Sequence, residues 1–188
     1  MMKNIPIQAV LTPRLHLRKL TRADVPAYFE RLAGSRTVTE HMLWQPHKDA
    51  AESAASIEKV LQRYAEGTCC RWGIALREDD SLIGIIDLLN FDDASNTCSF
   101  AYMLGEDFWG QGYGTEAVTA VFDFAFTVLQ ADAIIADHFA ENPASGAVMR
   151  KAGMHYVKRI PEKYAKDGVS HDAIEYCITK EDWKRSRH

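Results

Sequence analysis

Leucines alternate with charged residues over 14–20, a pattern that predicts a strand. Two helices are predicted next, over 21–34 and 49–67. In each segment apolar residues recur every three or four positions between a capping residue and a glycine. The stretch 35–47 between them follows no clean period. Short turns rich in Asp, Ser and Asn then separate three apolar runs, which are predicted as strands over 70–76, 82–91 and 97–104.

Three strands joined by such short turns are expected to form an antiparallel meander. The rest of the chain alternates between helix and strand periods. Its predicted elements are a helix after Gly114, a strand over 133–140, a helix over 142–153, and strands over 156–164 and 173–179. This order predicts an α+β fold, in which helices cover both faces of one mixed, mostly antiparallel sheet.

The composition is that of an ordinary globular protein, and no repeat or linker divides the 188 residues, so one domain over 1–188 is expected. A formal charge of −4 offers no general attraction to nucleic acid or to an anionic membrane. The chain shows no signal peptide and no membrane-spanning run, which predicts a cytoplasmic protein. Its four cysteines have no CxxC spacing and are expected to be reduced thiols.

Segment 109–115, Trp-Gly-Gln-Gly-Tyr-Gly-Thr, carries glycines at alternate positions. Without Cβ atoms on one face, its backbone N–H groups can converge on an anion, and the following helix adds its free first-turn donors. Such a turn can bind a pyrophosphate without a lysine, although the same spacing also fits a tight strand-to-helix connection with no ligand. A Rossmann site and a Walker loop are disfavoured. The turn follows a meander in mid-chain, and no Gly-Lys-Ser/Thr is present.

A second motif, Asn-x-x-Ser-x-x-Val-x-x-Lys-x-Gly, occupies 142–153. With the strand over 97–104 and the glycine-rich turn, the chain resembles the GNAT superfamily of N-acetyltransferases. Its branch is similar to the RimJ/RimL type, whose named members acetylate the N-termini of ribosomal proteins. The opening Leu-Thr-Pro-Arg-Leu-x-Leu-Arg over 11–18, the ending over 173–176 and Trp183 extend the resemblance to nearly the whole chain.

The resemblance implies acetyl-CoA as the cofactor, with CoA as product, and a splayed pair of central strands whose main chain contacts the pantetheine arm. The main-chain positions that match are Tyr102, Met103 and Leu104. The pyrophosphate would meet the amides of the glycine-rich turn. The residues that the resemblance assigns to cofactor binding are Met103, Leu104, Gln111, Gly112, Gly114, Thr115, Asn142 and Ser145. Arg150 or Lys151 could reach a 3′-phosphate, or could complement the dipole of their own helix.

The chain departs from the family at two places. Trp109 stands where the general family pattern has Arg or Gln, so one side-chain donor is missing and backbone amides must carry more of the phosphate binding. Trp at this position is familiar in the RimJ/RimL branch. The helix over 142–153 also lacks the tyrosine that many relatives place there.

The chemistry implied is direct attack of a neutral amine on the thioester in a ternary complex, with a thiolate leaving. Ser145 and Tyr102 are the predicted catalytic residues; Ser145 is either the proton donor to the thiolate or a cofactor contact only. For the base that takes the amine proton, Asp87, Tyr102, His138 and a chain of water remain alternatives. The explanations that need no catalytic role are strand-edge solvation of Asp87, a core hydroxyl for Tyr102 and a hydrogen-bonded core histidine at 138.

The acceptor site is expected around His41, Trp44 and Asp87, although packing between two helices also explains the aromatic residues of 35–47. His41 and His47 are poorly spaced for a metal, and none is expected. The acceptor is predicted to be a protein N-terminus or a small amine. The rival from another class is a non-catalytic acyl-CoA sensor or degenerate relative. Dimers are common in similar proteins, so a homodimer is an open expectation.

Overall fold

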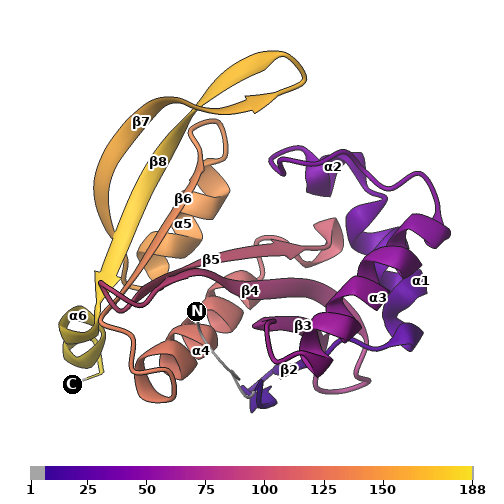
Figure 1. Cartoon of the computed structure of the whole chain (residues 1–188), viewed down its shortest axis with the longest axis horizontal. Helices are drawn as coiled ribbons and strands as arrows, with labels where there is room; N and C mark the ends of the chain where they lie inside the picture. The colour runs from indigo at the N-terminus through magenta and orange to yellow at the C-terminus, as the bar shows by residue number, and fades with distance from the viewer. Residues whose placement is uncertain (1–6, 188) are drawn as a thin grey trace.

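A computed structural model describes residues 7–187 and arranges the strands in one eight-stranded sheet (Figure 1). The order is β1-β2-β3-β4-β5-β6-β8-β7, and the β5–β6 pair is parallel whereas the other pairs are antiparallel. The predicted α+β fold with a mostly antiparallel sheet is confirmed. The strands are β1 Val10–Leu11, β2 Leu15–Arg18, β3 Arg71–Leu76, β4 Leu82–Asp92, β5 Thr97–Leu104, β6 Ala133–Phe139, β7 His155–Lys166 and β8 Val169–Thr179.

Helices cover both faces of the sheet, as predicted (Figure 1). Side chains of α4 and α5 share one hydrophobic cluster with the central strands, and those of α1 and α3 form a second cluster on the opposite face. The helices are α1 Val25–Tyr28, α2 Arg36–Thr39, α3 Ala50–Ala65, α4 Tyr113–Thr127, α5 Pro143–Lys151 and α6 Lys180–Arg185, with single turns η1 Arg22–Asp24, η2 Phe29–Ala33 and η3 Glu106–Phe108.

Strand β4 lies between the two clusters. Every residue from Leu82 to Leu88 is buried, because Ile83 and Ile86 pack toward α4 while Leu82 and Ile85 pack toward α1 and α3. Each buried leucine or isoleucine stabilises the fold by roughly 1.5–3 kcal/mol. The charged residue in this apolar run, Asp87, therefore needs a specific reason to be there.

The sheet opens at its centre. β5 and β6 pair only through Thr97 with Ala133 and Cys98 with Ile134, and beyond these residues the two strands diverge (Figure 1). This is the splayed pair that the family resemblance implies. Because α4 follows β5 and α5 follows β6, the divergence leaves the N-termini of both helices beside the opening.

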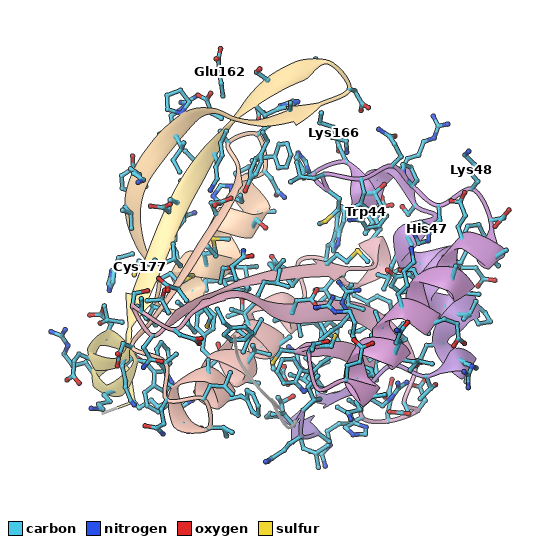
Figure 2. The ribbon with its side chains drawn as sticks, in the orientation of Figure 1. Trp44, His47, Lys48, Glu162, Lys166 and Cys177 are labelled. Carbon is cyan, nitrogen blue, oxygen red and sulfur yellow. The ribbon has the colours of Figure 1, made fainter. Side chains whose placement is uncertain are left out.

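The long β7–β8 hairpin curves away from the sheet, and its tip reaches the loop that follows α2 (Figure 1). Lys166 Nζ donates to the carbonyls of Thr39 and Glu40 at 2.8 and 2.6 Å (Figure 2). Gln45 Nε2 donates to Asp167 at the same place. The tip of the β7–β8 hairpin is thus bound to the loop after α2, and the hairpin is called the roof below.

Several short elements differ from the sequence prediction. β1 and α2 are too short to give a period, and α2 is held by the Ser35 hydroxyl, which accepts from the Val38 amide at 3.2 Å. The predicted helix over 21–34 is divided into 3-10, α and π turns, with Pro26 at its first α turn. α6 was also not predicted. Its start is a capping box between Thr179 and Asp182.

The four cysteines are free, and Cys69, Cys70 and Cys98 are buried. Burial raises the pKa of Cys98 to about 12, which disfavours its reactive thiolate form. Within residues 7–187 no helix combines the length and the apolar character needed to cross a membrane.

Candidate active site

The three glycines of the turn serve different purposes. Gly110 and Gly112 have φ angles of +72° and +85°, a region that strains any residue with a Cβ. Gly112 also caps α4, because its carbonyl accepts from the Glu116 amide at 3.0 Å. Gly114 is already helical, and a Cβ there would stand 3.3 Å from the Tyr102 ring. Its missing side chain lets α4 begin directly against β5.

The start of α4 presents main-chain donors to a groove of about 490 Å³. Within the described part of the chain, the amides of 112–115 donate to no carbonyl. Gly110, Gly112, Gly114 and Thr115 line the groove. A row of free first-turn amides at the positive end of a helix suits an anion, which is the geometry that the predicted phosphate contact requires.

Gln111, in contrast, faces away from this groove. Its side-chain amide donates to the Asp107 carbonyl at 2.6 Å, and its own carbonyl accepts from the Arg14 guanidinium at 3.0 Å. The cofactor contact predicted for Gln111 therefore has less support than those predicted for Gly112, Gly114 and Thr115.

The main-chain groups of β5 alternate between its two sides. The Gly105 amide donates to the Ile83 carbonyl of β4 at 2.8 Å. In an antiparallel ladder every second residue bonds the same neighbour, so Met103 also turns its main chain to β4, whereas Tyr102 and Leu104 turn theirs to the opening. The main-chain role predicted for Met103 is corrected accordingly. Its side chain still lines the groove.

The contacts of Trp109 show what this residue does in place of the Arg or Gln of the family pattern. Its indole Nε1 donates to the Leu104 carbonyl at 2.8 Å, and the ring lines the groove. The tryptophan thus occupies one of the two main-chain groups that Leu104 turns to the opening. It provides no donor for a phosphate.

The first turn of α5 forms the other wall of the groove. Asn142 Oδ1 accepts from the Ser145 amide at 3.2 Å and Pro143 follows it, which is the predicted cap. Ser145 and Tyr102 of β5 both line this groove. The two residues predicted to be catalytic therefore border the same cavity.

At the end of α5 the side chains of Arg150 and Lys151 make different contacts. Arg150 Nη1 donates to the Tyr176 hydroxyl at 2.7 Å, whereas Lys151 lines the groove. Of the two side chains considered for a 3′-phosphate, Lys151 is thus the one positioned for it.

A second cavity, of about 600 Å³, adjoins the groove and is called the inner chamber below. Its walls come from α1, α3, the loop 41–47, β3 to β5, and β6 and β7 under the hairpin roof. The groove and the inner chamber share the lining residues His41, Met42, Tyr102, Met103, Asn142 and Ser145. Two compartments of different composition therefore meet at the predicted catalytic pair.

The loop 41–47 forms a wall of the inner chamber rather than only a contact between helices. The His41 ring lies 5.8 Å from that of Phe139 on β6, and the Trp44 ring lies 5.4 Å from that of His47 (Figure 2). All four rings line the inner chamber. Among the described residues no group of His, Cys, Asp and Glu side chains could hold a metal ion.

Asp87 lines the inner chamber from β4 but is not solvated at a strand edge. It is only 7% exposed and receives two hydrogen bonds from Arg71 on β3, at 2.6 and 2.9 Å. Burial opposes the charge on Arg71, yet the Asp87 carboxylate outweighs it and raises the pKa of Arg71. The pair satisfies the charge that stood out in the apolar run of β4, and both carboxylate oxygens of Asp87 are engaged by Arg71.

The other two candidate bases differ in protonation. Burial raises the pKa of Tyr102, an effect that the Ser145 hydroxyl partly offsets, so Tyr102 suits proton donation rather than acceptance. His138 Nδ1 lies 2.7 Å from the Phe139 carbonyl, which can only accept, so Nδ1 carries the proton. Nε2 is buried without a partner in the described structure, and burial lowers the pKa of His138. His138 is therefore a neutral histidine with a free lone pair.

Several lining residues escaped the sequence analysis. Arg71 carried a signal, because a lone arginine opens an apolar strand opposite Asp87. Asp137, whose carboxylate accepts from Lys163 and from the Tyr164 hydroxyl, carried none. That contact depends on the curvature of the β7–β8 hairpin, which no local pattern encodes.

Comparison with known proteins decides the family. The model for the acetyltransferase (GNAT) domain matches residues 14–155. The chain belongs to this family. The family transfers acetyl groups from acetyl-CoA, so the predicted class of enzyme and its cofactor are confirmed.

Individual relatives agree with the RimJ/RimL-like branch. An uncharacterized N-acetyltransferase p20 of Bacillus licheniformis is 29% identical over 139 residues, which are 74% of this chain and 78% of the relative. The [ribosomal protein uS5]-alanine N-acetyltransferase of Escherichia coli K12 is 24% identical and covers 98% of this chain and 97% of its own. A RimL ribosomal L7/L12 α-N-protein acetyltransferase, solved with coenzyme A, shares the fold with a TM-score of 0.81 at 17% identity, over 92% of this chain and 98% of its own.

The glycine-rich turn yields a first prediction. Gly112→Ala should weaken binding of CoA by at least about tenfold, because a Cβ at φ +85° tilts the amides that face the groove. Gly153→Ala is the matched control. Gly153 has a φ of +91° and a nearest contact at 3.4 Å, as Gly112 has, but it lies outside the groove. Isothermal titration of both variants decides. Equal CoA affinities would contradict the assignment.

His138 yields a prediction about stability and pH. Its folded-state pKa lies below the unfolded value of roughly 6.5, so the unfolded chain binds the proton more tightly as the solution becomes acidic. The stabilisation of the folded state by neutral His138 is complete above the unfolded pKa and is lost as the pH falls below it. Between pH 7 and 5.5 the free energy of unfolding should fall, by up to about 1.4 kcal/mol per pH unit from this group. Urea titrations at several pH values measure this dependence. The free energy of unfolding should change less with pH in His138→Gln than in His155→Gln, which changes an exposed histidine.

Proposed function

We propose that this protein transfers an acetyl group from acetyl-CoA to a primary amine that enters through the inner chamber, and that it works as a single domain. One observation carries the proposal. The groove and the inner chamber share a border that includes Tyr102 and Ser145, and the thioester and the amine can approach each other at this border. Holding two reactants together in this way supplies much of the acceleration in such reactions.

The groove fits the cofactor in its chemistry. The amides of 112–115 receive the pyrophosphate, and Lys151 is within the same lining for a further phosphate. The main-chain groups of Tyr102 and the Leu104 amide, which face the opening, receive the pantetheine arm, whereas the Leu104 carbonyl already accepts from Trp109. Asn142 and Ser145 then border the thioester end of the cofactor.

The reaction forms a bond from the amine nitrogen to the acetyl carbon and breaks the bond from that carbon to sulfur. The Tyr102 amide faces the opening and can donate to the carbonyl oxygen as it gains charge. The Tyr102 and Ser145 hydroxyls are the donors for the departing thiolate, since Tyr102 stays protonated at neutral pH. The neutral His138 ring borders the inner chamber, but its Nε2 is buried beneath Gly146 of α5, so we propose that water carries away the proton that the amine loses.

The charges of the inner chamber restrict the amine. Its two lining carboxylates are already compensated, Asp87 by Arg71 and Asp137 by Lys163. Among the lining residues that the structure describes, no acid is left over for a second cation, whereas aromatic rings such as Trp44 and Phe139 form much of the wall. The acceptor is therefore an amine attached to an apolar or aromatic body, either a small molecule or the first residue of a protein, rather than a polyamine.

Turnover with a panel of amines tests the function. Release of free thiol from acetyl-CoA should be faster with phenethylamine, or with a peptide that begins with an apolar residue, than with spermidine. Mass spectrometry of the acetylated product identifies the acceptor nitrogen. If spermidine has the highest kcat/KM, the inference from charge is wrong. If CoA binds tightly and no amine is acetylated, the non-catalytic sensor replaces the enzyme.

The position of Tyr102 and Ser145, in the lining of both cavities, gives a prediction for catalysis. Tyr102→Phe and Ser145→Ala should each lower kcat by about 10- to 100-fold with little change in the KM for acetyl-CoA, because each removes a hydroxyl beside the leaving sulfur. Tyr156→Phe, which changes a tyrosine that is 60% exposed, is the control. A change confined to the KM for acetyl-CoA would reduce the residue in question to a cofactor contact.

A further inference from the structure

The side chain of Arg14, from the start of the chain, is bound to the glycine-rich turn about a hundred positions later in the sequence. Arg14 Nη1 donates to the Gln111 carbonyl at 3.0 Å, and Arg14 Nε donates to Glu116 Oε2 at 2.7 Å. The guanidinium also lies over the Tyr113 ring, 4.2 Å from its centroid. Arg14 thus contacts the turn before α4 and the first turn of α4 itself.

We infer that Arg14 is a positioning residue for the cofactor phosphates: it fixes the Gln111–Gly112 peptide so that the Gly112 amide faces the groove. In a planar trans peptide the C=O and the N–H point in opposite directions. Arg14 holds the Gln111 carbonyl on the side away from the groove, where Arg14 is not among the lining residues. The Gly112 amide, in the same plane, is then directed at the groove that Gly112 lines.

The peptide needs such a restraint because a glycine follows it. Rotation of this plane changes ψ of Gln111 and φ of Gly112, and Gly112, which has a φ of +85° and no Cβ, accepts φ angles of either sign. Without a partner for the Gln111 carbonyl, the same plane could present its oxygen to the groove. An oxygen there would repel the anion that the amide binds.

Arg14 is itself held on several sides. Glu116 accepts from the Arg14 guanidinium, from the Arg14 amide at 2.9 Å and from the Thr12 hydroxyl at 2.6 Å. Burial acts against ionisation of Glu116, but these hydrogen bonds outweigh it and lower the pKa of Glu116. Glu116 therefore stays a carboxylate at neutral pH and fixes the direction of the guanidinium.

The inference deepens the proposed function and rests on it, because it concerns the phosphate site of the same cofactor. It also bears on the side-chain phosphate donor that the family pattern has at position 109 and that Trp109 does not provide. The chain supplies an arginine, but from 11–18, and that arginine acts through a peptide plane rather than by contact with the phosphate.

Three ligands and two variants of Arg14 test this role by titration calorimetry. Arg14→Gln should weaken CoA and dephospho-CoA equally, by about tenfold, because both contain the pyrophosphate. It should leave pantetheine, which contains no phosphate, unchanged. Arg14→Lys should behave like Arg14→Gln, since one ammonium cannot reach both Gln111 and Glu116 in the geometry of a guanidinium. Arg22→Gln is the control, because Arg22 forms a similar two-point ion pair with Glu58 far from the groove.

Each other outcome overturns the inference. Unchanged CoA affinity in Arg14→Gln removes any role, and equal losses for all three ligands indicate a general loss of structure. Full rescue by Arg14→Lys means that the charge alone acts. These results differ from failure of the proposed function, in which the unaltered protein binds none of the three ligands.

Discussion

Strands β5 and β6 share only two residue pairs, and the site depends on the place where they separate. A strand edge inside a protein normally needs a partner for its main-chain groups. Here the main-chain groups of Tyr102 and the amide of Leu104 face an opening instead, with the free amides of α4 beside them, while the Leu104 carbonyl accepts from Trp109. Much of the binding surface is therefore backbone, which explains how an acidic protein without a lysine in its glycine-rich turn can receive a polyanion.

The alternation of side chains along β5 connects the site to both layers of helices. The Tyr102 side chain lies beside Gly114 on the α4 and α5 side, whereas Met103 belongs to the cluster of α1 and α3. One strand thus presents its main chain to the opening and successive side chains to opposite faces. Both residues nevertheless line the groove and the inner chamber, so the border between the two cavities is anchored in both layers.

What the sequence predicted correctly was mostly local. The capped start of α5 at Asn142 and the turn at Gly112 follow from residue types a few positions apart, and the meander follows from short turns. Sequence patterns were insufficient where strand register or a contact between distant segments decides. The main-chain role predicted for Met103 does not agree with its pairing to β4, and the ion pair of Asp87 with Arg71 was not foreseen. Nor was the contact of Arg14 with Gln111, which lies about a hundred positions away in the sequence. Periodicity carries no information about which partner a residue meets across the sheet.

The roof over the inner chamber has a consequence for how this protein can change. Lys166 holds the loop after α2 through the carbonyls of Thr39 and Glu40, groups that every amino acid possesses. The closure therefore does not depend on which side chains these two positions carry. The neighbouring residues His41 to Trp44, which line the inner chamber, are free to vary while the hairpin stays attached. The fold separates the part that encloses an acceptor from the part that chooses it, so new acceptors can evolve without rebuilding the enclosure.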